Sequence, residues 1–473
     1  MAYKPKSGKQ RQGGKQAGAA ASAGGSFAVS PARREAYGIL LELERGRGHA
    51  DELLRTERVT ALREADRNLA TTLVMGVLRW QRVLDAGIRA HLTKPNAKLD
   101  AEVLVALRLG AFQLRFLDRI PAHAAIGESV ALAKAAGHTF AAGMVNAVLR
   151  KVAAGPRDAD LDAAAAYPEW LVARWRREYG AEAAAEICRH GQQQARLALR
   201  VGSAEAEREL EMDGIVLEPG ALLTAARVVA AGDVTATRMV REGWVRVQEE
   251  GSQLIAELAG TVAAGERILD MCAAPGGKTL VLAERNPGAQ VVACEANPAR
   301  LRAMQERLAG MAQPELTGRI ETRLSDGVKL EGERVFAVVL VDAPCSGTGT
   351  LGRNPEIRHR LTEADLLRQQ ERQVGLLRAA LRLGGRRVVY STCSLEPEEN
   401  GAVVAQALAG NEGWRQVSVA GPIAELEAQG RLTAAGAGYL RECVDATGAL
   451  TLVPGRVETD GFFVAVMERA PGT

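Results

Sequence analysis

The chain has 473 residues, of which 47% are hydrophobic, 25% charged and 4% aromatic, with a formal net charge of +3. This length is more than one domain usually needs, so we expect several hydrophobic cores. The composition is typical of a globular protein and excludes collagen-like, disulfide-scaffold and wholly disordered chains. No apolar run is long enough to cross a membrane and no secretory signal is recognisable, so we expect a soluble, cytoplasmic protein.

The cysteines show neither metal-ligand spacing nor the density of a disulfide scaffold. They are Cys188, Cys272, Cys294, Cys345, Cys393 and Cys443. We therefore expect a reducing compartment and no bound metal. Cys345 and Cys393 are candidate site residues, and the other four cysteines are expected to be structural thiols.

Residues 1–29 form a basic segment of Gly, Ala, Lys and Gln with five cations and no acid. Such a segment cannot bury enough apolar surface to offset chain entropy, so we expect a disordered tail. The rest of the chain is not basic overall. A nucleic-acid surface would therefore be a local patch of Lys and Arg helped by the tail.

Residues 30–155 are expected to form an all-helical domain. Ser30 and Pro31 provide an N-cap and a first turn, and no segment shows the two-residue period of a strand. Apolar residues then recur at helical spacing. Examples are Ala36, Leu40, Leu43, Leu69, Leu73, Val77, Val103, Leu107, Val145, Val148 and Leu149.

Residues 156–250 show a mixed pattern, which predicts a small α+β RNA-binding or linker subdomain with a strand at 197–201. One helical segment gathers scarce aromatics and arginines. It contains Tyr167, Trp170, Arg174, Trp175, Arg176, Arg177 and Tyr179. Two interpretations stay open: the aromatics stack on bases, or they belong to a core beneath a solvated basic face.

Residues 251–473 alternate short apolar runs with helical stretches, which predicts a parallel α/β sheet. The expected strands are 268–271, 291–294, 320–324, 336–341, 388–391 and a final one at 462–466. The helix before the fifth strand begins with the capping pattern of Thr362 and Asp365 and ends at Gly384.

A turn of small residues follows the first of these strands and lets a cofactor approach the backbone. It comprises Cys272, Ala273, Ala274, Pro275, Gly276, Gly277 and Lys278. The spacing fits neither the dinucleotide fingerprint nor the nucleoside-triphosphate loop. Glu295 and Asp326 close the second and third strands, where carboxylates can bind a ribose and the adenine side. Their alternatives are a surface acid and a turn former. Together these features predict S-adenosylmethionine.

An acid and two thiols are expected at the same rim, because Asp342 and Cys345 follow the fourth strand and Cys393 follows the fifth. A disulfide switch is one alternative, and a metal pair lacks further ligands. Covalent catalysis is the other explanation. A thiolate that adds to carbon 6 of cytosine makes carbon 5 able to attack a sulfonium methyl group, and a second thiol can help release.

Three segments resemble the RNA cytosine-C5 methyltransferase family: DMCAAPGGKT, DAPCSGTGTLGRNPEIR and YSTCSLEPEEN. The helical region resembles the NusB-like domain that is fused to bacterial 16S ribosomal RNA methyltransferases, through the segments IPAHA and VNAVLR. The similarity covers roughly residues 30–468. It implies a multidomain chain with a Rossmann-like class I S-adenosylmethionine-dependent methyltransferase domain at its C-terminal end.

The resemblance also implies individual roles. Residues 272–278 would line the cofactor site, with Cys272 contributing its backbone, while Glu295 binds the ribose and Asp326 lies by the adenine. Cys393 would be the nucleophile and Cys345 would assist elimination. Asp342 would border the cofactor and hold ring nitrogen 3 and the exocyclic amine of the cytosine. Two positions depart from the pattern, since Glu295 replaces an aspartate and His359 an aromatic residue.

We therefore expect a cytoplasmic RNA (cytosine-C5)-methyltransferase that acts on 16S ribosomal RNA before subunit assembly is complete, because the target base must leave its stack. We expect a monomer without DNA or membrane partners. The alternatives are a transfer RNA substrate, or a non-catalytic RNA-binding or transcription factor. Phosphate contacts are expected at Arg174, Arg176, Arg177, Arg353 and Arg358.

Overall fold

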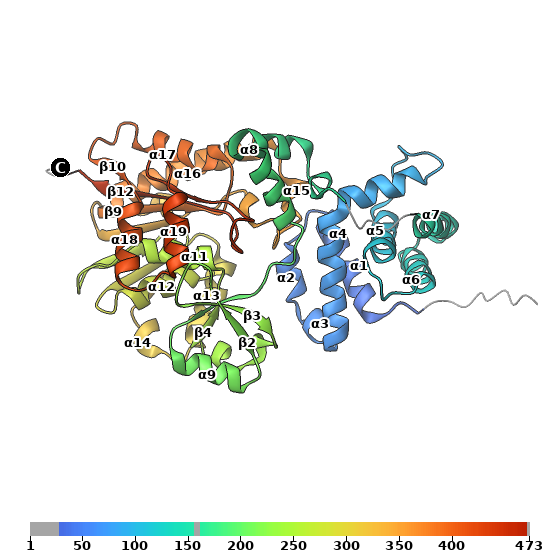
Figure 1. Cartoon of the computed structure of the whole chain (residues 1–473), viewed down its shortest axis with the longest axis horizontal. Helices are drawn as coiled ribbons and strands as arrows, with labels where there is room; N and C mark the ends of the chain where they lie inside the picture. The colour runs from blue at the N-terminus through green and yellow to red at the C-terminus, as the bar shows by residue number, and fades with distance from the viewer. Residues whose placement is uncertain (1–27, 156–160, 471–473) are drawn as a thin grey trace, which may run out of the picture.

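The computed structural model describes residues 28–155 and 161–470 (Figure 1). The basic tail expected at residues 1–29 therefore lies almost entirely outside the described residues. Three parts follow one another along the chain: a helical domain, a small four-stranded sheet and a large α/β domain. This arrangement confirms the multidomain fold that the sequence predicts.

The helical domain holds five longer helices and two short ones. They are α1 (Pro31–Glu44), α2 (Ala50–Leu54), α3 (Glu57–Thr60), α4 (Glu64–Ala90), α5 (Ala101–Phe116), α6 (Ala122–Ala135) and α7 (Ala142–Ala154). Helix α5 is buried along most of its length and contacts α1, α4, α6 and α7. Close packing needs Gly76 on α4, where a Cβ atom would lie 1.9 Å from the Phe112 ring. The predicted all-helical domain is confirmed.

Ser30 precedes α1 as predicted, but its hydroxyl makes no capping bond to the helix. Its backbone N–H and its hydroxyl both donate to one carboxylate oxygen of Glu128 on α6, at 2.8 and 2.7 Å. Arg33 on α1 forms an ion pair of 3.0 Å with the same carboxylate. The side chain that was expected to cap α1 instead ties it to α6.

The small sheet has the order β2-β3-β1-β4 with antiparallel pairs. Its strands are β1 (Ala198–Val201), β2 (Val216–Pro219), β3 (Ala226–Ala231) and β4 (Val245–Val247), with α9 (Ala204–Met212) between β1 and β2. The strand expected at 197–201 is thus present as β1. Helix α8 (Glu169–His190), which precedes the sheet and bends at Gly180, packs on the large domain instead.

The large sheet has the order β10-β12-β9-β8-β5-β6-β7, with β11 beside β12. Its strands are β5 (Arg267–Asp270), β6 (Gln290–Glu295), β7 (Ile320–Leu324), β8 (Phe336–Asp342), β9 (Gly384–Thr392), β10 (Trp414–Val417), β11 (Leu450–Leu452) and β12 (Phe462–Arg469). Strands β5 to β9 are parallel, as predicted. The final strand β12 is antiparallel to β9, so the sheet is mixed rather than wholly parallel.

Helices cover both faces of this sheet, and each face has its own apolar core. One core includes residues of α11 (Glu250–Leu258), α12 (Gly277–Arg285), α13 (Pro298–Ala309), α18 (Ala420–Ala428) and α19 (Ala434–Glu442). The other includes residues of α16 (Glu363–Leu383) and α17 (Gly401–Leu408). Helix α16 begins with the predicted capping box of Thr362 and Asp365.

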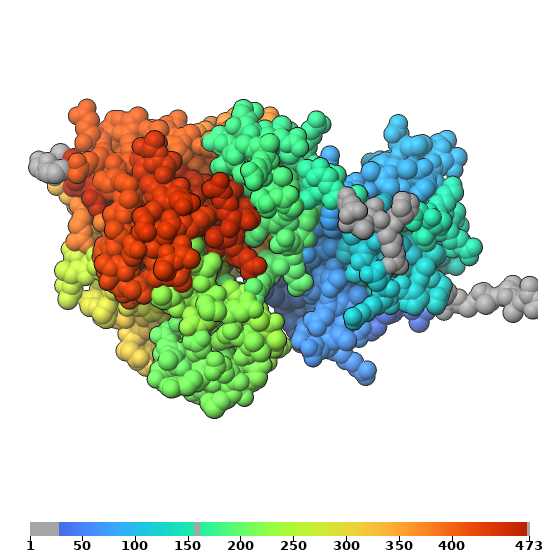
Figure 2. All heavy atoms as spheres, viewed as in Figure 1, coloured from blue at the N-terminus to red at the C-terminus, as the bar shows by residue number. Residues whose placement is uncertain are grey.

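The helical domain docks on residues 352–360 of the large domain, a segment that ends in the short helix α15 (Ile357–Arg360). The backbone N–H of Ala50 donates to the buried carboxylate of Glu356 at 3.1 Å. A ring nitrogen of His359 lies 2.7 Å from the carbonyl oxygen of Leu78. In Figure 2 the green segment that contains α8 lies between the large domain and the helical domain. This docking places the helical domain next to the loop that carries Cys345.

Candidate active site

The carboxyl ends of β8 and β9 bring two free thiols together. These strands are parallel neighbours, with Asp342 in register with Ser391. Cys345 and Cys393 lie in the loops that follow, and their Sγ atoms are 3.4 Å apart. Both thiols are partly exposed. The geometry suits two sulfur atoms that share a proton or act on one substrate atom.

A buried carboxylate, Glu399, joins the loop that carries Cys345 to the loop that carries Cys393. It accepts hydrogen bonds from the backbone N–H of Ser346 at 2.8 Å and from the amide of Gln373 at 3.1 Å. The hydroxyls of Ser346 and Ser394 both donate to its second oxygen, at 2.5 Å. Sequence reasoning missed this role, although Glu399 lies in the acidic run after Cys393.

Gly349 allows its backbone to pack closely against those of Cys393 and Gly461. Its N–H donates to the carbonyl of Cys393 at 2.9 Å, and its own carbonyl accepts from the N–H of Gly461 at 2.8 Å. A Cβ atom at position 349 would lie 2.3 Å from the carbonyl oxygen of Gly461. Only glycine therefore fits between the Cys393 loop and the start of β12.

Lys278 and Asp342 form an ion pair that links the small-residue turn to the carboxyl ends of β8 and β9, beside the two thiols. The Lys278 Nζ atom lies 2.8 Å from Asp342 Oδ2 and donates to the Ser252 hydroxyl, also at 2.8 Å. The hydroxyl of Ser391 donates to the other oxygen of Asp342 at 2.9 Å. The structure thus directs Lys278, expected only as a member of the cofactor turn, toward Asp342.

Protonation of these groups follows from their surroundings. Burial opposes the charge on Lys278, but Asp342 more than compensates, so the pKa of Lys278 is raised. The pKa of Cys345 is raised well above its usual value by its hydrogen bond to Cys393 and by burial. Cys345 is therefore a neutral thiol whose S–H can donate to the Cys393 sulfur.

The predicted cofactor turn runs from the end of β5 into α12. Gly276 adopts a positive φ of 95°, and a Cβ atom there would lie 3.2 Å from Met304. Asp270, buried at the end of β5, accepts a hydrogen bond from Thr279, while its Oδ1 atom has no partner. Burial raises the pKa of Asp270 to about 6. An unpaired buried acceptor beside a glycine turn fits a ligand that carries an amino group. Sequence reasoning did not assign Asp270.

The two expected cofactor acids lie in adjacent loops. Glu295 is buried and accepts from the N–H of Asn297 at 2.8 Å. Asp326 is exposed, and its side chain accepts from the N–H of Val328 at 3.2 Å, so it does form the local turn that was its alternative interpretation. The backbones of the two loops meet where the N–H of Ser325 donates to the carbonyl of Glu295.

The aromatic residues of α8 belong to an apolar cluster, with Trp175 buried and Trp170 and Tyr179 partly buried, which favours the core interpretation. Trp175 is 1% exposed, and its indole N–H donates to Glu396 at 3.0 Å. Arg174 pairs with the same carboxylate at 2.8 Å and also with Glu398. These contacts fix α8 against the segment that follows Cys393.

Three of the five arginines expected to contact phosphate instead have partners inside the protein. Arg358 is 1% exposed, and its guanidinium lies 4.0 Å from the centre of the Tyr167 ring. Arg174 is held by the two carboxylates just described. Arg353 pairs with Asp460 at 2.7 Å. Only Arg176 and Arg177 are exposed on α8 as expected.

A cavity of about 250 Å³ opens beside Cys345 at the junction with the helical domain. Its lining includes Ser346, Ile357 and Arg360 from the large domain. His49, just before α2, also lines it and lies 3.5 Å from Glu356. The helical domain therefore forms one wall of the space next to the thiol.

Two further observations concern the described part of the chain. No group of three or more His, Cys, Asp or Glu side chains there is arranged to bind a metal ion. None of its helices combines the length and the apolar character needed to cross a membrane.

Family models match all three parts of the chain. Residues 259–468 match the family described as 16S rRNA methyltransferase RsmB/F, and residues 30–154 match the NusB family. Residues 167–232 match the ferredoxin-like domain of RsmF/B-like methyltransferases. The small sheet therefore belongs to a domain that recurs with this type of methyltransferase domain.

Curated relatives extend over almost the whole chain. It is 31% identical over 91% of its length to the probable ribosomal RNA small subunit methyltransferase B of Bacillus subtilis, and covers 97% of that protein. It is 36% identical over 76% of its length to the ribosomal RNA small subunit methyltransferase B of Pseudomonas putida, and covers 84% of it.

Solved structures share the fold. The crystal structure of PH0851 superposes with a TM-score of 0.75 at 22% identity, covering 94% of this chain and 100% of that one. NSun6 from Pyrococcus horikoshii gives a TM-score of 0.52 at 18% identity, covering 66% and 99%. With the domain matches and the curated relatives, the conclusion is that the chain belongs to the RsmB/F family of 16S rRNA methyltransferases and is an S-adenosylmethionine-dependent RNA methyltransferase.

Proposed function

We propose that the enzyme methylates carbon 5 of a cytidine in 16S ribosomal RNA through a covalent bond between Cys393 and carbon 6 of the base. The observation that carries this proposal is the separation of 3.4 Å between the sulfur atoms of Cys345 and Cys393, beside Asp342. Two free thiols at one rim suit a reaction in which one sulfur attacks the base and the other assists its release.

The first half of the reaction uses Cys393 and Asp342. The Cys393 thiolate adds to carbon 6 while ring nitrogen 3 takes a proton from solvent, and the ionised Asp342 accepts hydrogen bonds from that N–H and from the exocyclic amine. The bound cofactor supplies an electrophilic methyl group. Carbon 5 would then form a bond to that methyl carbon while the sulfonium–methyl bond breaks and its electron pair stays on the sulfur. Lys278, which stays protonated, keeps Asp342 in place through their contact of 2.8 Å.

The second half restores the aromatic ring. The proton on carbon 5 leaves to a water molecule, and the electron pair of that C–H bond forms the double bond between carbons 5 and 6. The carbon–sulfur bond breaks, and Cys393 departs as a thiolate. The raised pKa of Cys345 keeps its S–H available to stabilise the departing sulfur.

The remaining roles follow the same interpretation. Residues 272–278 and Glu295 would hold the cofactor, with Asp326 at the adenine side. A target base must leave its stack to reach both thiols, and the cavity that opens beside Cys345 lies next to this site. We propose that the substrate is ribosomal RNA before full assembly, that the enzyme works as a cytoplasmic monomer, and that DNA is not a substrate.

Transfer of a radiolabelled methyl group to unmodified 16S ribosomal RNA tests the chemistry. Cys393→Ala should abolish transfer, and Cys345→Ala should accumulate a protein–RNA adduct on a denaturing gel. Cys443→Ala, a partly buried thiol far along the chain, is the matched control and should behave as wild type. Exchange of the two phenotypes would reverse the roles of the thiols.

The substrate is tested separately. Transfer to transfer RNA but not to 16S RNA would keep the chemistry and overturn the substrate, and binding of RNA without any transfer would favour the non-catalytic factor. Comparison of naked 16S RNA with assembled small subunits tests the timing, and stronger transfer to the subunits would contradict it.

A further inference from the structure

A second pocket, of about 340 Å³, lies where the small sheet meets the large domain. Its lining includes Arg200 on β1, Trp244 just before β4, Glu284 and Arg285 at the end of α12, and Arg431 after α18. Helix α12 has nine residues and is therefore roughly 13 Å long. Its first residues form the cofactor turn and its last residue lines this pocket, so the two sites are separate.

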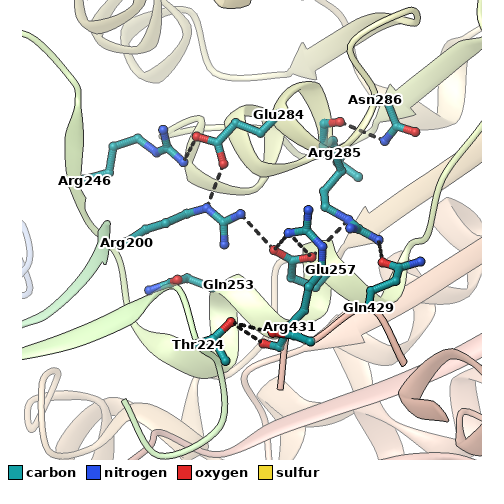
Figure 3. Close-up of polar contacts among 12 residues, drawn as sticks. Arg200, Thr224, Arg246, Gln253, Glu257, Glu284, Arg285, Asn286, Gln429 and Arg431 are labelled. Atoms are coloured by element: carbon teal, nitrogen blue, oxygen red, sulfur yellow. Dashed lines mark hydrogen bonds and ion pairs between the residues drawn. The ribbon is translucent and has the colours of Figure 1, made fainter. Parts of the chain in front are cut away.

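Three guanidinium groups converge on one buried carboxylate, that of Glu257 on α11 (Figure 3). Arg200 Nη2 lies 2.8 Å from it, Arg285 Nε 3.0 Å and Arg431 Nη1 3.4 Å. The side chains of Glu257, Arg200 and Arg285 are all at most 5% exposed, whereas that of Arg431 is 37% exposed. Arg431 is thus the cation at the mouth of the pocket.

A second carboxylate, Glu284, completes the cluster. It pairs with Arg200 Nε at 2.7 Å and with Arg246 Nη2 at 2.5 Å. The cluster then contains four guanidinium groups and two carboxylates. A third acid, Glu425, contacts Arg285 only through the amide of Gln429 at the protein surface. Even when Glu425 is counted, positive charge is in excess.

Part of this positive charge is buried without a hydrogen-bond partner. Arg200 Nη1, on a residue that lines the pocket, is shielded from solvent and has no hydrogen-bond partner. Arg246 Nε also has none, but Arg246 does not line the pocket. Burial also lowers the pKa of Arg246 and of Arg285. Burying cations in excess of their counter-ions is costly, and an anion in the pocket would remove that cost.

The chemistry of the lining selects the anion. A guanidinium fork matches the oxygen atoms of a phosphate group in shape and charge. Trp244, 41% exposed, adds an aromatic surface on which a base can stack. We propose that this pocket binds the phosphate group of a nucleotide, with its base against Trp244. The phosphate can belong to RNA or to a free nucleotide, and the pocket shares no residue with the proposed reaction.

Binding measurements on the full chain test the proposal. The probes are inorganic phosphate, cytidine 5′-monophosphate and a single-stranded RNA, followed by calorimetry and, for the RNA, by fluorescence anisotropy. The test variant is Arg431→Gln, because this side chain is the most exposed of the four and its contacts to Glu257 are the longest. The matched control is Arg415→Gln, an exposed arginine on β10 at the far edge of the large sheet. Melting temperatures verify that both variants fold.

We expect Arg431→Gln to weaken binding about tenfold, the effect of one charged hydrogen bond, while Arg415→Gln changes little. Trp244→Ala should weaken the nucleotide and the RNA but not inorganic phosphate. Loss of affinity for RNA alone identifies an RNA phosphate, and loss for the mononucleotide alone identifies a free nucleotide. If Arg431→Gln lowers the melting temperature but leaves the affinity for all three probes equal to that of Arg415→Gln, the cluster only joins the domains and the proposal is wrong.

Discussion

Lys278 at the start of α12 and Asp342 at the end of β8 are joined by an ion pair of 2.8 Å, although 64 residues separate them in the chain. The contact connects the turn expected to hold the cofactor with the strand that leads to Cys345. Asp342 raises the pKa of Lys278 although burial opposes the charge. Lys278 is therefore a positioning residue for Asp342.

Replacement of Lys278 by Gln should lower kcat for methyl transfer about tenfold or more and leave RNA affinity within about twofold. The reason is that a partly buried carboxylate loses its cation. Single-turnover rates and RNA titrations separate the two quantities. Ser252→Ala, which removes only one bond to Lys278, should cost a smaller factor. Equal rates for wild type and Lys278→Gln would contradict the positioning role.

Glu295→Gln should weaken the binding of S-adenosylmethionine about tenfold, because the charged hydrogen bond that we propose between the ribose and Glu295 becomes a neutral one. Calorimetry without RNA measures this directly. Asp326→Asn should have a smaller effect, since Asp326 is exposed. The control is Glu321→Gln on neighbouring β7, whose carboxylate pairs with Arg323. Unchanged cofactor affinity in Glu295→Gln would remove Glu295 from the site.

Gly349→Ala should destabilise the enzyme by about 1 to 3 kcal/mol, because the new Cβ atom would meet a backbone carbonyl that has no room to move. Methyl transfer should fall with it, since Gly349 holds the Cys393 loop. The matched control is Gly401→Ala at the start of α17, where no atom lies within 4 Å of the added carbon. Urea denaturation compares the two, and similar midpoints would count against the close approach.

His359 makes docking of the helical domain sensitive to acid. Burial lowers its pKa to about 4 from the ordinary 6.5. Between these values the unfolded chain binds more protons than the folded one, so the free energy of unfolding falls as the pH falls through this window. The difference in pKa corresponds to about 3 kcal/mol at or below pH 4.

His359→Gln should remove this part of the pH dependence, because a glutamine amide can still donate to the Leu78 carbonyl but takes up no proton. Denaturation at pH 7 and at pH 4 measures it in both proteins. His123→Gln, an exposed residue on α6, should retain the wild-type dependence. A parallel pH dependence in wild type and His359→Gln would contradict the assignment.

Most main strands of the large sheet could be predicted because they are apolar runs buried along most of their length, as in β5, β6, β8 and β12. The short edge strands β10 and β11 could not, since neither shows a clear period over so few residues. The antiparallel direction of β12 was also hidden, because direction depends on the path of the chain between β9 and β12 rather than on local pattern.

The candidate site, too, could be predicted from the sequence only in part. Motif residues such as Cys345 and Cys393 were found because strand ends meet at one rim. Glu399 was missed because its partners lie up to 53 residues away and its own neighbours are acids of an ordinary surface type. The arginines were misjudged for a related reason: amphipathic spacing does not tell which charged side chain faces another domain, as with Arg358.

The docking of residues 352–360 on the helical domain also bears on the order of events during synthesis. The helical domain emerges from the ribosome first, and domains generally fold as units in that order. The loop after Cys345 emerges some two hundred residues after that domain is complete. This loop therefore docks on a helical domain that has already folded. A nascent chain completes the contacts between the two only near the end of translation.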